Sequence, residues 1–278
     1  MYDVVIIGSG PAGISAAIYL KRAKKNVIIV SKHKSALQKA EKIENYYGIE
    51  SISGSELYNT GIKQAERLGI PIDEDEVTNI SYENNFIVTT VNKEYQAKYV
   101  IIATGTNRVR PNIKGIKEFE GKGVSYCAIC DAFFYRNKDV AVIGSGNYAI
   151  HEAEQLRPVV NSVTILTNGD KMVENRSSSD FNIDETPIRE FRGTNVIEEV
   201  EFDNNNTKKL DGVFVAIGTA SSTDLARKIG AVIKNNYIVV NDNMETSVKG
   251  LYACGDCTGG ILQINKAVYE GAKAALDI

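Results

Sequence analysis

The sequence predicts an α/β fold made of two Rossmann-like dinucleotide-binding domains of the three-layer ββα type, and three observations point to it. A strand followed by a glycine-rich loop and a helix occurs twice, as VVIIGSGPAG at residues 4–13 and as VAVIGSGNYA at residues 140–149. The two copies are 136 residues apart, which indicates a duplicated domain rather than a short structural repeat. Between them lie Cys127 and Cys130, whose spacing allows a disulfide.

The length of 278 residues is enough for about two domains with sizeable cores. No apolar run approaches the roughly 20 residues of a membrane span, and no basic segment with a cleavage site begins the chain. We therefore expect a cytoplasmic protein with no membrane association. The four cysteines are too few for a disulfide scaffold, and two CxxC pairs in a reducing compartment favour redox chemistry or metal binding.

The first half of the chain begins with a βαβ unit. We expect a strand at residues 2–7, a helix at about 12–22 and a strand at 27–30, and the continuous apolar runs are typical of strands covered on both faces. Alternating residues at 80–91 predict hairpin strands. A buried strand at 99–103 then runs into a Thr-Gly pair.

The second half repeats this order. We expect a strand at residues 139–143, a helix at about 149–156 that Pro158 stops, and strands at 162–166 and 212–217.

The remaining segments are predicted from their composition. Residues 174–179 and 203–209 are rich in polar residues and are expected to be loops. Near the end, a strand at 251–253 leads through a loop at 254–260 into a helix at 261–276 with one apolar face.

Taken in order, these landmarks resemble the low-molecular-weight thioredoxin reductases over nearly the whole chain. The motifs are the first GxGxxG, Glu44-Asn45-Tyr46, Ala103-Thr104-Gly105, Cys127-Ala128-Ile129-Cys130-Asp131, the second GxGxxA, and Gly255-Asp256 followed by Gln263.

The resemblance implies an FAD-binding domain formed by residues 1–112 and 245–278. A redox-disulfide domain at 115–242 would be inserted in it, abbreviated and degenerate in its nucleotide site. Hinges would lie at 110–112 and 241–243. It also implies a homodimer with thioredoxin as substrate.

The expected FAD site begins at the first glycine loop. Gly8 permits the tight turn, Gly10 lets the backbone approach the pyrophosphate, and Gly13 allows close packing of helix and strand. Free N–H groups at the helix start would hold the phosphate. The full expected set is Gly8, Ser9, Gly10, Pro11, Ala12, Gly13, Ser31, Lys32, Leu37, Asn45, Ala103, Thr104, Gly105, Gly255, Asp256, Gln263 and Ile264.

Two features depart from the usual pattern around this site. The acidic residue expected at the end of the second strand is absent, because Ser31 and Lys32 stand there. The family's Gly-Gly-Gln loop is also missing, and Lys34-Ser35-Ala36 takes its place before Leu37.

The expected catalytic residues are Cys127, Cys130 and Asp131. The two cysteines begin a predicted helix, and a helix N-terminus lowers thiol pKa. The resemblance implies that Cys130 lies against the flavin, that Cys127 attacks the partner's disulfide, and that Asp131 donates and accepts the proton. The alternatives are a zinc site, which needs four ligands, and an inert buried pair. For Cys254 and Cys257 we expect small buried residues.

At the second glycine loop, the sequence lacks the residues expected for a nicotinamide cofactor site. NADPH-dependent relatives follow the next strand with His-Arg-Arg and a further Arg, which bind the 2′-phosphate. Here Thr167-Asn168-Gly169 and Val173 occupy those positions. Tyr148 replaces a small residue, and His151 stands where the family usually has Glu. The pattern is similar to the ferredoxin-dependent flavin thioredoxin reductases, in which FAD converts single electrons into pairs.

The charge distribution allows more than one kind of partner, and two rival functions remain. Residues 1–50 hold eight Lys or Arg against four acidic residues, which suits either a solvated surface or docking of an acidic partner such as ferredoxin. No aromatic residues interleave with these charges, so we expect no nucleic-acid partner. An NAD(P)H-dependent thioredoxin reductase with an unusual pocket and a flavin redox sensor without turnover are the rival functions.

Overall fold

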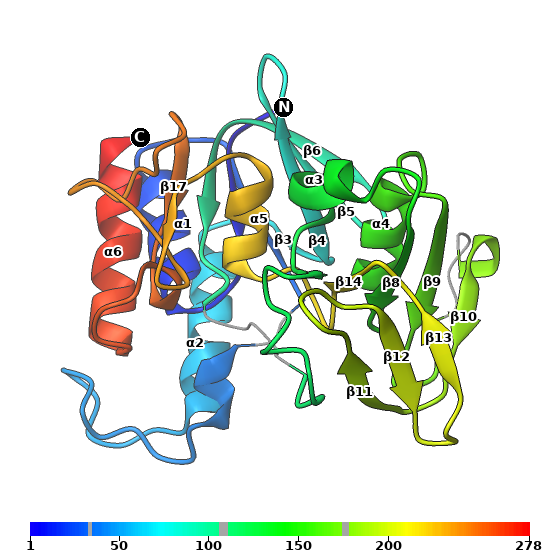
Figure 1. Ribbon diagram of the computed structural model, residues 1–278. Coiled ribbons are helices and arrows are strands. Elements are labelled where there is room, and N and C mark those ends of the chain that lie inside the picture. The colour runs from blue at the N-terminus through cyan, green and yellow to red at the C-terminus, as the bar shows by residue number, and fades with distance from the viewer. Residues whose placement is uncertain (33–34, 106–110, 174–177) are drawn as a thin grey trace. The chain divides into compact units, whose positions relative to one another are not determined.

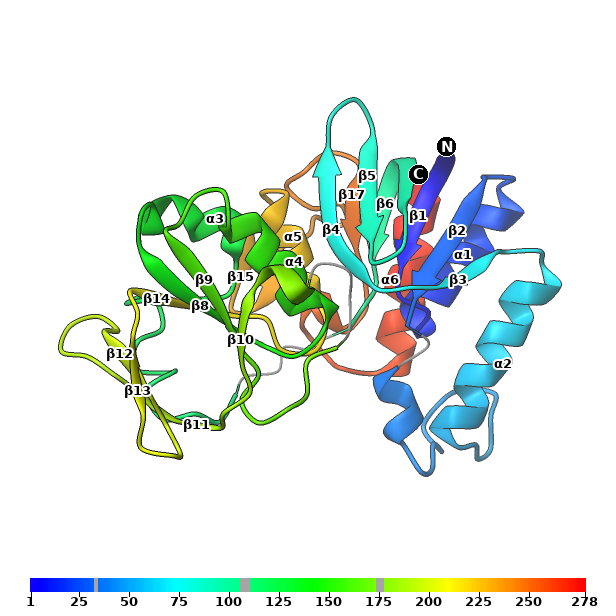
Figure 2. The same cartoon turned by 90° about the vertical axis from the view of Figure 1, so that its right-hand side faces the viewer.

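The computed structural model describes all residues except 33–34, 106–110 and 174–177. The chain forms two compact units (Figures 1 and 2). Unit 1 comprises Met1–Asn107 and Ser221–Ile278, and unit 2 comprises Arg108–Ala220. Each unit contains a sheet with parallel strands and a helix that follows a glycine loop, which confirms the α/β class and the duplicated architecture.

Seven strands form the sheet of unit 1, in the order β3-β2-β1-β6-β5-β4 with β17 paired to β6. Their bounds are β1 Tyr2–Ile7, β2 Val27–Ser31, β3 Ile72–Glu74, β4 Val77–Tyr82, β5 Phe86–Thr90, β6 Glu94–Ile102 and β17 Leu251–Ala253. The pairs among β1, β2, β3, β6 and β17 are parallel, whereas β4, β5 and β6 form an antiparallel meander. The carboxyl ends of β1, β2, β6 and β17 therefore meet at one edge of the sheet.

The helices of unit 1 are α1 (Pro11–Arg22), α2 (Gly54–Arg67), α5 (Ser222–Lys228) and α6 (Ile264–Asp277), with short 3₁₀ turns η1 (Ala36–Lys39) and η4 (Asp256–Thr258). Helices α1 and α6 lie side by side (Figure 1). They approach closely at Gly271, where an added Cβ would overlap the carbonyl oxygen of Ala12. Apolar residues of α1, α6 and the strands form the core of this unit.

Unit 2 contains a five-stranded parallel sheet in the order β10-β9-β8-β14-β7 and a three-stranded antiparallel sheet, β11-β12-β13. The strands are β7 Val124–Ser125, β8 Asp139–Ile143, β9 Ser162–Leu166, β10 Asn182–Asp184, β11 Ile188–Arg192, β12 Glu199–Phe202, β13 Thr207–Lys209 and β14 Gly212–Val215. The helical segments are α3 Ala128–Asp131, η2 Ala132–Tyr135, α4 Asn147–Leu156 and η3 Ser178–Asp180. Apolar residues of both sheets share one core.

The structure confirms most of the expected elements. Strands β1, β8, β9 and β17 have the predicted bounds, and β4 and β5 form the expected hairpin. The loop expected at 203–209 is wrong at its end, because Thr207–Lys209 pairs with β12 and hides part of that strand's edge. Of the loop expected at 174–179, residues 174–177 lie outside the described part of the chain.

The chain returns from unit 2 to unit 1 at an earlier residue than expected. We expected residues 221–242 in the inserted domain, but the structure assigns them to unit 1. Helix α5 packs against β4, and Lys228 Nζ donates to the Thr78 carbonyl oxygen at 3.1 Å. The strands β15 (Ile233–Lys234) and β16 (Tyr237–Ile238) also belong to unit 1.

The two segments expected to be hinges have different outcomes. The segment at 241–243 forms a turn inside unit 1, in which Asn241 N–H donates to the Glu245 carbonyl oxygen at 2.8 Å. At the other expected hinge, Arg110 lies outside the described residues.

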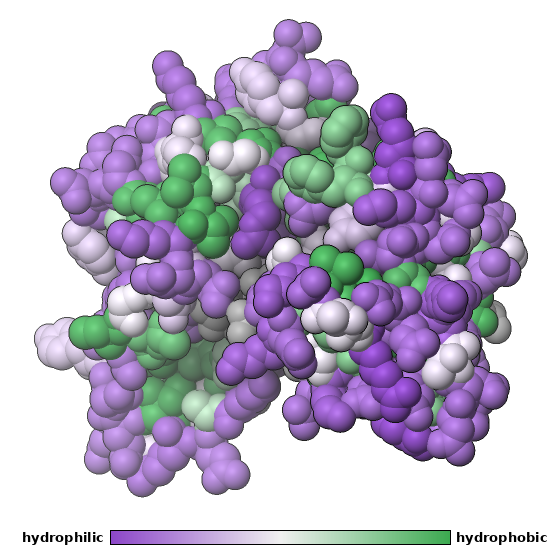
Figure 3. Space-filling view, viewed as in Figure 1, coloured by the Kyte–Doolittle hydropathy of each residue, from purple (hydrophilic) through white to green (hydrophobic). Residues whose placement is uncertain are grey.

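The face seen in Figure 3 is mostly hydrophilic, with separate hydrophobic patches between the polar side chains. Within the described residues, no helix is long and apolar enough to span a membrane.

Candidate functional site

The first glycine loop connects β1 to α1 and is shaped by close backbone contacts. Gly8 has φ +108°, and an added Cβ would stand 2.5 Å from the Ala103 carbonyl oxygen. An added Cβ on Gly13 would overlap the carbonyl oxygen of Gly8. Gly10, by contrast, would accept a Cβ, since among the described residues the nearest atom to it is Ser35 Oγ at 3.5 Å, an ordinary van der Waals contact. Two glycines are thus required by the packing of the described residues, and the third is not.

Helix α1 begins at Pro11 with Gly10 as its N-cap, and no side chain caps it. Ala12 and Gly13 are buried within its first turn. Ser9 is also buried, and its hydroxyl bonds Ser31 Oγ at 2.7 Å and Tyr58 Oη at 2.6 Å. An uncapped helix start beside a glycine that this packing does not require fits the pyrophosphate of a dinucleotide.

The end of β2 carries Ser31 and Lys32, as expected. Lys32 Nζ forms an ion pair with Glu76 at 2.8 Å. Glu76 is only 6% exposed, and its other oxygen, Oε1, is buried with no hydrogen-bond partner among the described residues. Sequence reasoning missed Glu76, because nothing in the chain marked β3 as the parallel neighbour of β2. The structure thus brings a carboxylate to the strand end where the sequence lacks one.

The segment after β6 lies against the glycine loop. Ala103 N–H donates to the Ile7 carbonyl oxygen at 2.8 Å, which places Thr104 and Gly105 at the same edge. The Oγ1 of Thr104 is buried and unpaired within the described structure. Such an orphaned hydroxyl fits a site that a cofactor completes.

The remaining expected FAD residues lie on η1, the following loop and the segment before α6. Leu37 is half-buried in η1, whereas Asn45 and Gln263 are exposed and joined by a 3.2 Å bond from Asn45 Nδ2 to Gln263 Oε1. Ile264 is the first residue of α6. Gly255, at φ +84°, packs against Ala12, because an added Cβ would be 3.0 Å from the Ala12 Cβ.

A network of hydrogen bonds around Glu270 holds the backbone at Gly255, next to Asp256. Glu270 Oε2 accepts the Gly255 N–H at 2.8 Å, the Thr258 hydroxyl at 2.8 Å and Lys266 Nζ at 2.9 Å. Burial raises the pKa of Asp256, and the Lys266 cation partly opposes that shift. Residues 266 and 270 have the i, i+4 spacing of a helical ion pair, a signal that sequence analysis could have used.

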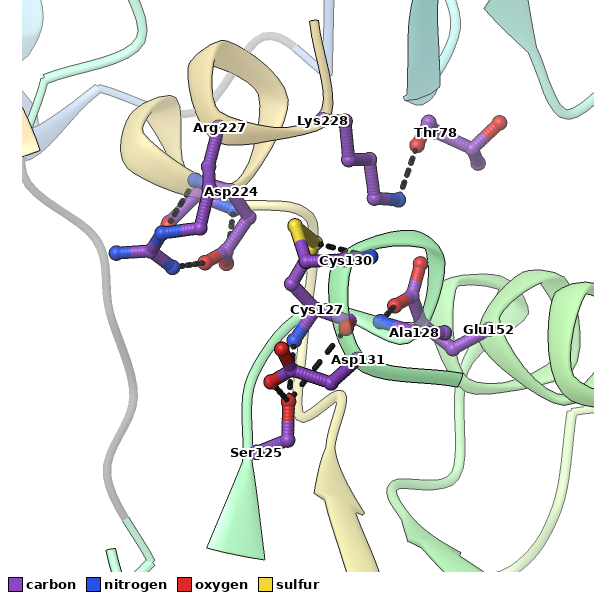
Figure 4. Close-up of a disulfide and its surroundings, with 11 residues drawn as sticks. Thr78, Ser125, Cys127, Ala128, Cys130, Asp131, Glu152, Asp224, Arg227 and Lys228 are labelled. Carbon is purple, nitrogen blue, oxygen red and sulfur yellow. Dashed lines mark hydrogen bonds and ion pairs between the residues drawn. A yellow bond between two sulfur atoms is a disulfide. The ribbon is translucent and has the colours of Figure 1, made fainter. Parts of the chain in front are cut away.

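Cys127 and Cys130 form a disulfide with a sulfur–sulfur distance of 2.07 Å (Figure 4). Cys127 is the N-cap of α3, and its Sγ accepts the Cys130 N–H at 3.2 Å. Cys127 is 2% exposed, whereas Cys130 is exposed. This difference does not favour the expectation that Cys127 is the sulfur that attacks a partner protein.

Asp131 reaches the disulfide through a serine that sequence analysis did not single out. Ser125 Oγ donates to Asp131 Oδ2 at 2.6 Å and accepts the Cys127 N–H at 3.1 Å (Figure 4). The half-buried carboxylate is therefore held beside the backbone of Cys127. That position fits general acid–base work on the thiols.

The second CxxC pair lies in unit 1 and is free of disulfide bonding. Cys254 and Cys257 are fully buried, and Cys257 Sγ donates to the carbonyl oxygens of Cys254 and Ile102. Burial raises the pKa of Cys254 far above its usual value and that of Cys257 to about 12. The described residues contain no cluster of three or more His, Cys, Asp or Glu that could hold a metal ion.

The second glycine loop keeps the tight backbone turn of a nucleotide-binding loop. Gly144 has φ +152°, and an added Cβ would overlap the Ala216 carbonyl oxygen. The turn after β9 folds onto the loop, since Val173 N–H donates to the Ser145 carbonyl oxygen at 2.9 Å. This turn brings the Asp170 carboxylate to 3.4 Å from Ser145 Oγ.

The surroundings of this loop add bulk. Tyr148, near the start of α4, is 1% exposed and is one of the largest fully buried side chains. His151 is half-buried one turn further along the helix.

Four of the eight basic residues among the first fifty lie at the end of α1 that is away from the glycine loop. Lys21 and Arg22 occupy the last turn of α1, with Lys24 and Lys25 just beyond it. A twelve-residue helix is about 18 Å long, so this cluster lies well away from the phosphate-binding end of α1.

Comparisons with known proteins agree with this geometry. Residues 2–271 match the family described as pyridine nucleotide-disulphide oxidoreductase. A thioredoxin reductase of Bacillus subtilis (strain 168) is 33% identical over 297 residues, with 100% of this chain and 94% of that protein covered.

Solved structures agree as well. The atypical thioredoxin reductase TRi from Desulfovibrio vulgaris Hildenborough has a TM-score of 0.94 and 37% identity, with 100% and 96% of the two chains covered. A ferredoxin-flavin thioredoxin reductase from Clostridium acetobutylicum has a TM-score of 0.72 and 34% identity, with 99% and 96% covered.

The glycine loop, the cysteine pair and these matches, which extend over nearly the whole chain, lead to one assignment. The chain belongs to the pyridine nucleotide-disulphide oxidoreductase family and is a flavoprotein of the thioredoxin reductase type, with FAD as its cofactor.

Proposed function

We propose that this enzyme reduces thioredoxin through FAD and the Cys127–Cys130 disulfide, using electrons from reduced ferredoxin rather than from NADPH. The observation that carries the donor is the second glycine loop, where the Asp170 carboxylate lies 3.4 Å from Ser145 Oγ. No arginine occurs among residues 167–173. A phosphate at this loop would meet the Asp170 carboxylate, and residues 167–173 supply no guanidinium to bind it.

The proposed FAD site uses the first glycine loop for the pyrophosphate. The start of α1, which has no side-chain cap among the described residues, and the backbone at Gly10 would receive it. Glu76 Oε1 and Thr104 Oγ1 are two of the buried polar atoms that lack a protein partner among the described residues. FAD supplies the conversion of one-electron deliveries into the two-electron reduction that a disulfide requires.

The chain's own sulfurs carry out the transfer to thioredoxin. In the reduced enzyme, one thiolate attacks the thioredoxin disulfide, so that an intermolecular disulfide forms and the thioredoxin disulfide breaks. The second enzyme thiol then attacks the enzyme sulfur of that mixed bond. This step restores the Cys127–Cys130 disulfide and releases the thioredoxin dithiol. Two electrons move, and the two protons come from the enzyme thiols through a carboxylate placed as Asp131 is.

Accessibility bears on which sulfur meets the partner. Cys130 is exposed and Cys127 is 2% exposed, so we assign the attack on thioredoxin to Cys130 and the closing attack to Cys127. The apolar residues Ile129, Phe133 and Phe134 are exposed on the same segment, the two phenylalanines at 70% each. An exposed aromatic pair beside a reactive sulfur supports docking of a protein with an apolar face.

Three parts of this proposal depend on the relatives more than on this chain. One similar solved structure is a ferredoxin-flavin thioredoxin reductase, which supports the donor. A homodimer and a cytoplasmic, reducing location fit the same kind of enzyme, and free Cys254 and Cys257 suit such a compartment.

The test is an anaerobic titration of the oxidised holoenzyme, followed by flavin absorbance and by thioredoxin reduction. Reduced ferredoxin should bleach the flavin and support turnover, whereas NADPH and NADH at 1,000-fold excess (on the order of millimolar, above ordinary KM values) should do neither. Rapid bleaching by NADPH would refute the donor assignment.

Variants test the cysteine roles. The probe is thioredoxin with a single cysteine that carries thionitrobenzoate as a mixed disulfide. With Cys127→Ser, the Cys130 thiolate should displace thionitrobenzoate and trap thioredoxin as a mixed disulfide, and with Cys130→Ser this should not occur. Trapping only by Cys130→Ser would reverse the assignment.

An NAD(P)H-dependent enzyme is the second candidate, favoured by one observation. The second glycine loop retains its tight turn at Gly144 and an uncapped helix start at Gly146. The same titration decides between the two donors.

A further inference from the structure

Glu152 is a buried carboxylate that the proposed reaction does not use. It lies on α4, is 1% exposed, and its Oε2 accepts the Ala128 N–H at 2.9 Å. Figure 4 shows this side chain extending from α4 to the first residue of α3. Removing a carboxylate from water costs free energy unless hydrogen bonds compensate it, so the contact that Glu152 makes with another element needs an explanation.

The contact is made at the redox turn itself. Ala128 follows Cys127 in the chain and is the first residue of α3. The Ala128 nitrogen is bonded to the Cys127 carbonyl carbon, so the carboxylate lies within about 5 Å of the Cys127 Cα. Cys127 Sγ accepts the Cys130 N–H at the same helix start. Sulfur and carboxylate therefore share the N–H groups of one turn.

A negative charge on the Glu152 carboxylate would oppose a negative charge on the sulfur at the start of α3. A thiolate at a helix start is normally stabilised by the free N–H groups there. The Glu152 carboxylate engages one of these groups, and the Asp131 carboxylate is linked to the same turn through Ser125. Each of these carboxylates, when ionised, opposes a negative charge on the nearby sulfur. Stabilising the thiolate stabilises the reduced pair and makes a disulfide more oxidising, so opposing the thiolate makes the dithiol a stronger reductant.

We propose that Glu152 is a positioning residue that holds the active-site turn through Ala128 and keeps the Cys127–Cys130 pair strongly reducing. This inference rests on the proposed function, in which that pair reduces thioredoxin. It also gives α4 a task in an enzyme that does not use the start of that helix for a nicotinamide phosphate.

The experiment equilibrates the FAD-loaded enzyme anaerobically with reduced and oxidised dithiothreitol at one alkaline pH. Samples are then quenched in acid, and the thiols are counted by labelling after denaturation. Glu152→Gln keeps an oxygen that can accept the Ala128 N–H but removes the charge. The equilibrium constant for reduction should rise between about threefold and tenfold, and tenfold corresponds to about 30 mV. Glu154→Gln, an exposed change on the same helix, should stay within twofold of the wild type.

Two further variants separate charge from structure. Glu152→Asp keeps the charge and should also stay within twofold, even if its melting temperature falls. Glu152→Met is a second neutral variant that decides the matter if the Gln variant does not fold. A constant that is unchanged in the neutral variants, or that rises equally in Glu152→Asp, would overturn the inference.

The two proposals fail in different ways. A wild-type disulfide that does not equilibrate with dithiothreitol would refute the proposed function and this inference together. A normal wild-type titration with an unshifted neutral variant would refute this inference alone.

Discussion

Replacing Gly10 by alanine should separate cofactor binding from folding. Gly10 has φ −70° and ψ −178°, an extended conformation that alanine adopts without strain. Among the described residues, the added methyl group would contact Ser35 Oγ at 3.5 Å, an ordinary van der Waals distance. The stability of the protein without FAD should therefore change by less than about 0.5 kcal/mol. The methyl group would, however, occupy the space through which the pyrophosphate approaches the backbone.

The magnitude follows from ligand linkage. At a free FAD concentration of about 100 times Kd, binding stabilises the wild type by about 2.7 kcal/mol. If the methyl group weakens binding about 100-fold, the same FAD concentration stabilises the variant by only about 0.4 kcal/mol. About 2.3 kcal/mol of FAD-dependent stability should thus disappear, with little change in its absence.

Gly13→Ala is the matched control for packing. Its Cβ would overlap the Gly8 carbonyl oxygen and lie 3.0 Å from the Gly8 carbonyl carbon, so α1 must shift away from the loop. Overpacking of this kind costs about 1–3 kcal/mol even without FAD. Circular dichroism with and without FAD, together with FAD fluorescence titration, measures both quantities. Wild-type FAD affinity in Gly10→Ala would refute the reasoning, as would a loss of stability without FAD equal to that of Gly13→Ala.

Three further outcomes are expected. Because burial raises the pKa values of Cys254 and Cys257, the native oxidised enzyme should show no thiol reactive toward Ellman's reagent from pH 7 to about 9, and two after denaturation. Changing both Phe133 and Phe134 to Ser should raise the KM for thioredoxin about tenfold while flavin reduction stays normal. Hydrogen bonds from Ser162 and then Asn161 lower the pKa of Asp139, so wild type should exceed Asp139→Asn in stability above about pH 4, and urea titrations should show this advantage vanish as the pH falls through the lowered pKa.

The sequence predicted the elements whose residues follow a strict local rule. Strands β1 and β8 contain the apolar runs 4–7 and 140–143, each followed directly by glycine, and their predicted bounds agree with the structure. Glycine at Gly8 and Gly144 is needed because each turn has positive φ and touches a neighbouring carbonyl. These requirements are local, so the pattern alone reveals them.

Other features depend on pairing between distant residues. Segment 221–242 has no local signal for the unit to which it belongs, and that choice is made by contacts such as Lys228 with Thr78, which are 150 residues apart. Ser125, Glu76 and Glu152 were missed for the same reason, because an ordinary polar residue becomes functional only through the neighbour that the fold gives it.

The two glycine loops show why a motif predicts a fold more reliably than a ligand. Both have a tight turn at the first glycine and an uncapped helix behind it. Within the described residues of the first loop, a Cβ on Gly10 would meet no atom closer than Ser35 Oγ at 3.5 Å, and Thr104 offers an unpaired buried hydroxyl. At the second, the turn at 167–173 brings the Asp170 carboxylate against Ser145. The backbone that can bind phosphate is the same in both, so the bound ligand is decided by charge and space contributed from other strands. In the proposed enzyme, the duplicated domain would keep its fold without a nucleotide, and helix α4 would support the disulfide through Glu152.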